Sequence, residues 1–183
     1  MIFKSSKRKR VGLFGGSFDP PHLGHLSICT WLLERNVVDE IWVIPCFEHP
    51  FGKKLTEFKL RYQMCLFAFN SLGNHHIKVS DIERELGGTS RTLRTIRHLQ
   101  ATYPEVQFQL IAGSDNEAAS SRWHQFDIIK ELVPVVFVPR GEDSEIPNIA
   151  STDIRQRISK NQKFRDLVNT EVAVYIITNG LYS

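Results

Sequence analysis

The sequence has few cysteines, no long apolar run and little excess of charge of either sign, and each absence excludes a class of protein. Its three cysteines, Cys29, Cys46 and Cys65, form no C-x-x-C pair and have no histidine at metal-ligand spacing, which argues against a disulfide framework and a zinc site. No apolar run is long enough to cross a bilayer, and the first residues lack the apolar core of a signal peptide. We therefore expect reduced thiols, no membrane partner and a cytoplasmic location.

The charge is close to balanced, with a net value of +3 over 183 residues. Hydrophobic residues make up 42% and charged residues 23%, close to the average of globular proteins, which suits one domain with its own core. We expect this domain to span residues 11–183 and residues 1–10 to form a basic extension. Such a segment could contact RNA or an anionic surface, but we favour a solvated extension and expect no nucleic-acid partner.

Short β-branched runs alternate with longer segments of helical periodicity, without internal repeats. Strands are predicted over residues 10–14, 40–45, 77–80, 106–113 and 133–139. Helices are predicted over about 24–34, 59–71 and 89–103, from Ser151 onward and over 171–177. This alternation predicts a single-domain α/β fold with a doubly wound, Rossmann-like parallel sheet. Such sheets bind ligands beyond the carboxyl ends of their strands, at a switch point.

The most informative stretch is GGSFDPPHLGH, residues 15–25, which follows a predicted strand and precedes a helix. Gly15 and Gly16 let the backbone approach a ligand closely and expose its N–H groups, and the helix N-terminus adds partial positive charge. His22 and His25 stand three residues apart at the helix start, so both can face one anion. We interpret the stretch as a phosphate site, although it contains neither a Walker A pattern nor G-x-G-x-x-G.

This stretch resembles the G-G-[ST]-F-D-P-x-H-x-G-H signature of a nucleotidyltransferase superfamily, within which the chain resembles the nicotinate/nicotinamide mononucleotide adenylyltransferase family. The resemblance implies transfer of AMP from ATP, with Mg²⁺, to nicotinate mononucleotide or nicotinamide mononucleotide, releasing pyrophosphate in NAD biosynthesis. It implies that His22 and His25 contact the ATP phosphates. The other ATP-binding residues implied in this turn are Gly15, Gly16, Ser17 and Phe18. Relatives often form dimers or larger assemblies, so a homo-oligomer stays open.

Asp19 lies inside the same turn, and three roles stay open for it. It could orient a histidine, lie near the metal, or only form an Asx-type turn before Pro20.

A second motif, IASTDIR at residues 149–155, resembles the family's I-S-S-T-x-I-R element. We expect Ser151 or Thr152 to cap a helix, so that hydroxyls and free N–H groups meet a terminal phosphate. Arg155, one turn further on, would add a bidentate contact. A simple N-cap would explain the motif if it stood alone, but its pairing with the first motif favours phosphate binding.

The loop after the second predicted strand offers Lys53 and Lys54 where the family has a phosphate-binding lysine, and we prefer Lys53, which follows the flexible Gly52. The acceptor phosphate is already a competent nucleophile that attacks the α-phosphate in line, so catalysis needs only positioning and charge neutralisation. A phosphate-bound Mg²⁺ needs few protein ligands, so no metal-binding side chains are assigned. The catalytic residues expected are His22, His25, Lys53 and Arg155.

The acceptor side is expected in the middle of the chain. Gly113 and Asp115 belong to a stretch that resembles the family's G-x-D-N element, which holds ribose and nucleotide groups. Trp123 stands where the family has a tryptophan that stacks on the pyridine ring, as an aromatic face suits a cationic ring. Ser90 and Thr92 match the family's G-x-S-Y-T stretch.

Three arginines need separate comment. Arg91 stands where the family has tyrosine, and Arg94 replaces a usual acidic residue. Arg91 could pair with a nicotinate carboxylate and favour the acid over the amide, point to solvent, or indicate a different acceptor. Arg140 resembles the family's R-x-G arginine near the adenine.

Two other interpretations compete with this one. A sister nucleotidyltransferase acting on phosphopantetheine, or using CTP, would share the fold, but those relatives have a shorter turn without the G-x-D-N and tryptophan combination. A binding module that keeps the nucleotide pocket and works through its basic extension is the alternative from another class.

Overall fold

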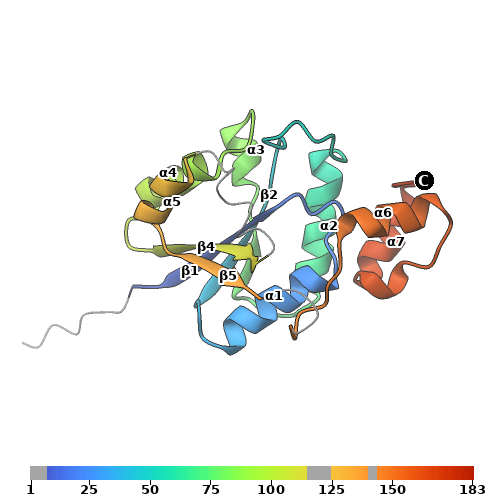
Figure 1. Cartoon of the computed structure of the whole chain (residues 1–183), viewed down its shortest axis with the longest axis horizontal. Helices are drawn as coiled ribbons and strands as arrows, with labels where there is room; N and C mark the ends of the chain where they lie inside the picture. The colour runs from blue at the N-terminus through green and yellow to red at the C-terminus, as the bar shows by residue number, and fades with distance from the viewer. Residues whose placement is uncertain (1–7, 115–124, 140–143) are drawn as a thin grey trace, which may run out of the picture.

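The computed structural model describes residues 8–114, 125–139 and 144–183, which form a parallel sheet with helices on both faces (Figure 1). The five strands of the sheet run in the order β3-β2-β1-β4-β5, and every neighbouring pair is parallel. They are β1 (Arg10–Gly16), β2 (Glu40–Pro45), β3 (Ile77–Val79), β4 (Gln107–Gly113) and β5 (Val135–Val138). The predicted doubly wound sheet is confirmed, with its switch point between the carboxyl ends of β1 and β4.

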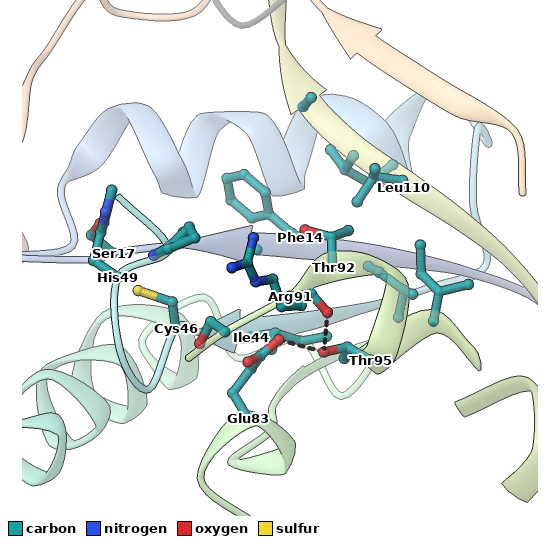
Figure 2. A pocket seen from close by; sticks show the side chains of 18 of the residues that line it. Phe14, Ser17, Ile44, Cys46, His49, Glu83, Arg91, Thr92, Thr95 and Leu110 are labelled. Carbon is teal, nitrogen blue, oxygen red and sulfur yellow. Dashed lines mark hydrogen bonds between the residues drawn. The ribbon is translucent and has the colours of Figure 1, made fainter. Parts of the chain in front are cut away.

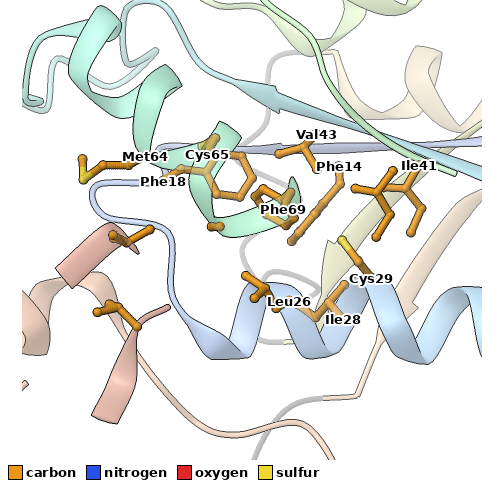
Figure 3. Packing of buried hydrophobic residues seen from close by; sticks show 14 of the residues in the cluster. Phe14, Phe18, Leu26, Ile28, Cys29, Ile41, Val43, Met64, Cys65 and Phe69 are labelled. Atoms are coloured by element: carbon orange, nitrogen blue, oxygen red, sulfur yellow. The ribbon is translucent and has the colours of Figure 1, made fainter. Parts of the chain in front are cut away.

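Helices cover the two faces of the sheet and enclose a core on each. They are α1 (Leu23–Glu34), α2 (Phe58–Asn70), α3 (Ile82–Leu86), α4 (Thr92–Thr102), α5 (Phe126–Leu132), α6 (Ser151–Ser159), the 3₁₀-helix η3 (Arg165–Leu167) and α7 (Thr170–Thr178). β1 alternates between the faces, with Phe14 in the core beside α1 and α2 (Figure 3) and Leu13 in the core beside α4 and α5. No helix among the described residues is long and apolar enough to span a bilayer.

The predicted elements are largely confirmed, and the main error lies before α4. The helix predicted over residues 89–103 begins only at Thr92, and a separate helix, α3, precedes it. Gly87 and Gly88 lie between the two helices with φ of +65° and +61°, a range that favours glycine, and Gly87 is the residue at which α3 ends. The short α5 was not predicted.

The cysteines and the last predicted helix agree with expectation. Cys29 and Cys65 are fully buried free thiols, and burial raises the pKa of both. The predicted docked helix is α7, which packs against α2, with the Tyr175 and Phe67 rings 5.4 Å apart.

Arg10, the last residue counted in the basic extension, is also the first residue of β1, where the strand predicted over residues 10–14 begins. The Arg10 guanidinium donates to the carboxylate of Asp39 at 2.6 Å, and Lys9 pairs with Glu40. Two of the five basic residues among the first ten therefore neutralise acids at the amino end of β2.

Glu40 is a buried carboxylate at the first position of β2, only 3% exposed. It accepts hydrogen bonds from the Trp42 indole N–H at 2.6 Å and from Lys78 at 2.8 Å, and it also contacts Lys9. Burial alone would raise the pKa of Glu40, but the hydrogen bonds from Lys78, Lys9 and Trp42 outweigh burial and bring it to about 2.

We expect Glu40→Gln to lower the free energy of unfolding by about 1–3 kcal/mol at pH 7, a range reduced because both lysines are half exposed. A depressed pKa gives stability that is present above the unfolded value of 4.5 and lost as the pH falls toward 2. Urea unfolding at pH 7 and pH 3 should therefore show the difference shrinking in acid. An exposed Glu105→Gln control should change little, and an equal loss for Glu40→Gln at both pH values would contradict the assignment.

Candidate functional site

A cavity of about 540 Å³ opens at the carboxyl ends of β1 and β4, at the switch point of the sheet (Figure 2). Its walls come from the end of β1, the first turn of α1, the loop after β2 and the start of α4. Among its lining residues are the predicted site residues Gly15, Gly16, Ser17, His25, Ser90, Arg91, Thr92 and Gly113. The two sides of the predicted site, phosphate and acceptor, therefore meet in one cavity.

The two histidines of the first motif are not equivalent. His22 precedes α1 as its N-cap and is only 2% exposed, whereas His25 lines the cavity. Their rings stack with centroids 3.6 Å apart, and the His22 backbone N–H donates to His25 Nδ1 at 3.1 Å. Because Nδ1 accepts, Nε2 carries the proton in the neutral ring of His25 and is the donor atom of that ring.

The glycine between the histidines is required by close packing. A Cβ on Gly24 would lie 3.0 Å from the Pro147 carbonyl oxygen and 3.1 Å from the His22 ring. Neither the carbonyl nor the buried ring can retreat easily, so only glycine lets the segment before α6 approach α1 this closely.

Side chains of the turn between β1 and α1, residues 17–21, fix it to the rest of the protein by packing and by hydrogen bonds. The Phe18 ring is 1% exposed and meets Phe14 and Phe69 edge-on in the core, so only the backbone of Phe18 is free to meet a ligand. Asp19 accepts hydrogen bonds from the Thr56 N–H at 3.2 Å and the Tyr182 hydroxyl at 2.7 Å. Both oxygens of the Asp19 carboxylate therefore have donors, and both donors lie outside the turn.

The second motif contacts the first through side-chain hydrogen bonds. The Ser151 hydroxyl donates to the Pro20 carbonyl at 2.8 Å, and the Arg155 guanidinium donates to the Asp19 carbonyl at 2.6 Å and to the Thr152 hydroxyl at 3.2 Å. The prediction that Ser151 or Thr152 caps α6 is wrong, because Ala150 is the N-cap and both residues lie inside the helix. The start of α6 thus supports the β1–α1 turn directly.

Sequence reasoning missed Arg61, the largest fully buried side chain of the described residues, which is 1% exposed. Its guanidinium donates to the carbonyls of Thr56 at 2.7 Å, Ser17 at 2.9 Å and Phe47 at 3.3 Å. These three acceptors belong to the β1–α1 turn and to the loop after β2. Its position, as a charged residue within a strongly apolar predicted helix, was the one feature of the sequence that could have indicated its buried role.

On the acceptor side, Ser90 is 6% exposed and joins two loops. Its hydroxyl accepts from the Phe47 N–H at 2.8 Å, and its N–H donates to the Glu48 carbonyl at 3.0 Å. Arg91 is the N-cap of α4 and reaches into the cavity (Figure 2). Ser90, which was predicted to bind the acceptor, thus links two loops and also lines the cavity, and the basic side chain of Arg91 faces the same cavity.

Beneath Arg91 lie two further residues that the sequence did not single out. Glu83 is 5% exposed and accepts a hydrogen bond from the Thr95 hydroxyl, which also lies 3.4 Å from the Arg91 carbonyl. This chain of contacts joins α3 to the first turn of α4 and so supports Arg91 (Figure 2).

Lys53 and Lys54 are both exposed on the loop after β2. Lys53 borders a second hollow of about 690 Å³ that shares His49 and Arg91 with the first, whereas Lys54 lines neither. Burial lowers the pKa of His49, and the charges of Lys53 and Arg61 lower it further, so its surroundings favour the neutral form of the ring.

Three predicted residues, Asp115, Trp123 and Arg140, lie outside the described residues. Within the described ranges, no group of three histidine, cysteine, aspartate or glutamate side chains is arranged to hold a metal ion.

Comparison with known proteins agrees with this geometry. A family model described as Cytidylyltransferase-like matches residues 13–157. Relatives from Anaeromyxobacter dehalogenans (strain 2CP-C) and Myxococcus xanthus (strain DK1622), both named "Probable nicotinate-nucleotide adenylyltransferase", are 37% and 34% identical to this chain. The alignments cover 95% and 94% of this chain and 97% and 94% of the relatives.

The fold is shared with a solved structure, the Plasmodium falciparum nicotinic acid mononucleotide adenylyltransferase complexed with NaAD. Its TM-score is 0.77 at 21% identity, over 95% of this chain and 97% of that chain.

We expect Arg61→Lys to lower the free energy of unfolding by about 2–4 kcal/mol, because one ammonium group cannot reach three carbonyls and leaves buried acceptors unpaired. Chemical denaturation measures this loss. Arg97→Lys, on the exposed side of α4, makes the same change without buried contacts and should shift stability by less than about 0.5 kcal/mol. Equal stability of the two variants would show that Arg61 does not support the loops.

Proposed function

The chain belongs to the nicotinate-nucleotide adenylyltransferase family, within the cytidylyltransferase-like proteins, and we propose that its switch-point cavity binds ATP and nicotinate mononucleotide and joins them. The product is the dinucleotide, and pyrophosphate is released. One observation carries the proposal: the β1–α1 turn and the start of α6, two motifs more than 100 residues apart, meet at the edge of a cavity that also contains His25 and Arg91.

The reaction proceeds by in-line attack of a phosphate oxygen of nicotinate mononucleotide on the α-phosphorus of ATP. A new P–O bond forms, the bond from the α-phosphorus to the bridging oxygen breaks, and pyrophosphate leaves with the electron pair. His25, through Nε2–H, and the N–H groups at Gly15, Gly16 and the start of α1 stabilise charge on the α-phosphate. No general base is needed because the attacking phosphate is already an anion.

His22 acts behind His25 in this proposal. Its backbone N–H fixes His25 Nδ1 at 3.1 Å and its ring stacks on His25, which sets the direction of the catalytic ring. Arg155 and Ser151 stabilise the turn by donating hydrogen bonds to its Asp19 and Pro20 carbonyls. Lys53, on the loop after β2 and at the second hollow beside the cavity, supplies positive charge toward the β- and γ-phosphates.

Mg²⁺ would enter on the phosphates of ATP, which with water supply the oxygen ligands it prefers, and it would neutralise charge on the leaving pyrophosphate. The donors around the cavity, which are N–H groups, hydroxyls, His25 and Arg91, fit phosphate and carboxylate oxygens. We also propose that the reaction takes place in the cytoplasm, where buried thiols such as Cys29 and Cys65 stay reduced.

The acceptor is distinguished by its carboxylate. Arg91 reaches into the cavity from the start of α4 and is supported from below by Thr95 and Glu83. A guanidinium group here favours the acid, which carries a carboxylate on the pyridine ring, over the amide, which does not.

Pyrophosphate release with ATP, Mg²⁺ and each of three acceptors tests the proposal. We expect the highest kcat/KM with nicotinate mononucleotide, a lower value with nicotinamide mononucleotide and none with phosphopantetheine. Arg91→Ala should reduce the acid-to-amide ratio by about tenfold, the range for loss of a charge-assisted pair. Turnover of phosphopantetheine alone would instead assign the chain to a sister transferase.

We expect His25→Ala to lower kcat by about 10²- to 10³-fold while the KM for ATP changes by less than about threefold, because its N–H acts on charge that develops in the transition state. Steady-state kinetics measure the split. His98→Ala removes an exposed histidine of α4 and should leave both constants unchanged. A comparable loss in kcat and in ATP affinity would refute a transition-state role.

A further inference from the structure

The segment that follows α7 reaches back to the β1–α1 turn. The Tyr182 hydroxyl donates to Asp19 Oδ1 at 2.7 Å, across a sequence separation of 163 residues. The chain bends after α7 to allow this, with the Leu181 N–H bonded to the Ile176 carbonyl at 3.0 Å. The backbone of Tyr182 has φ of +68°, in the left-handed region that residues other than glycine rarely adopt. The contacts around Tyr182 therefore stabilise this backbone conformation.

Asp19 connects this contact to the candidate site, because it belongs to the β1–α1 turn. It is 2% exposed, and a carboxylate buried to this degree needs donors for both oxygens. Oδ2 accepts from the Thr56 N–H at 3.2 Å, while Oδ1 accepts from Tyr182. Its backbone carbonyl accepts from Arg155 at 2.6 Å. Asp19 therefore links the turn to the loop after β2, to α6 and to the segment after α7.

The hydroxyl is the part of Tyr182 that matters for this link. The ring of Tyr182 packs on the edge of the core that contains Phe14 and Phe18, and a phenylalanine would preserve that packing. Burial, and then the charge of Asp19, raise the pKa of Tyr182 well above its ordinary value, so the hydroxyl keeps the proton that it donates. Without the hydroxyl, Oδ1 has no other donor among the described residues.

We propose that Tyr182 is a positioning residue of the nucleotide site, which acts through the Asp19 carboxylate to hold residues 17–21 in the conformation that receives the phosphates. A carboxylate that loses its donor turns toward water and takes the turn with it, which displaces the backbone N–H groups next to His25. Misplacement of this kind reduces the rate more than it reduces binding. The kinetic part of this inference rests on the proposed function of the cavity.

Tyr182→Phe tests the inference, with Tyr175→Phe as the matched control. Tyr175 lies on α7, packs on Phe67 and makes no side-chain hydrogen bond among the described residues, so its variant removes a hydroxyl without the link. We expect Tyr182→Phe to lower kcat about tenfold with little change in the KM for ATP, and to speed hydrogen exchange at the Thr56 amide about tenfold. The control should match the wild-type chain in both measurements.

A double-mutant cycle shows whether Tyr182 acts through Asp19. In an Asp19→Ala background, Tyr182→Phe should reduce kcat by less than about twofold further, because its target is gone. The same tenfold loss in that background would overturn the proposal, as would unchanged Thr56 exchange in Tyr182→Phe. If Asp19→Ala does not fold, the Thr56 exchange in Tyr182→Phe decides alone. Absence of pyrophosphate release by the wild-type chain would refute the proposed function, while the exchange measurement would still test the link.

Discussion

The carbonyl groups of the turn between β1 and α1 need hydrogen-bond partners inside the protein, and this requirement constrains the helices around the turn. The turn has no regular secondary structure of its own, so these partners come from other parts of the chain. In this chain the Ser17, Asp19 and Pro20 carbonyls receive hydrogen bonds from Arg61, Arg155 and Ser151. Each partner is a side chain from a helix far along the sequence, so the site takes shape only when α2 and α6 dock.

This requirement explains why the two motifs occur together. Ser151 and Arg155 resemble phosphate ligands when seen in the sequence, and in the structure they satisfy the carbonyls of the first motif. The cavity is lined by other polar side chains, among them His25, Ser17 and Arg91. Ser151, Arg155 and Arg61 support the turn beside the cavity, which suits the proposed reaction, because that reaction depends on positioning and charge rather than on a covalent intermediate.

The local elements were predictable where one physical signal dominated. β2 was predicted to the residue, because its apolar run is short, bounded and rich in β-branched side chains. The start of α4 was predicted three residues too early, because Thr89 and Ser90 pair with Glu48 of the loop after β2, a contact that no local pattern shows. The seven-residue α5 is too short to show a clear helical period and was missed for that reason.

The residues of the turn, its position at the end of β1 and the α/β fold could be predicted from the sequence, because they depend on residues close together in the chain and on the alternation of strands and helices. The contacts of Asp19, Arg61 and Tyr182 could not, and they become visible only in the folded chain. Periodicity says that a side chain is buried but not which partner it meets, and these three contact partners up to 163 residues away. Such pairings follow from how helices and loops dock on the sheet, which no local pattern encodes.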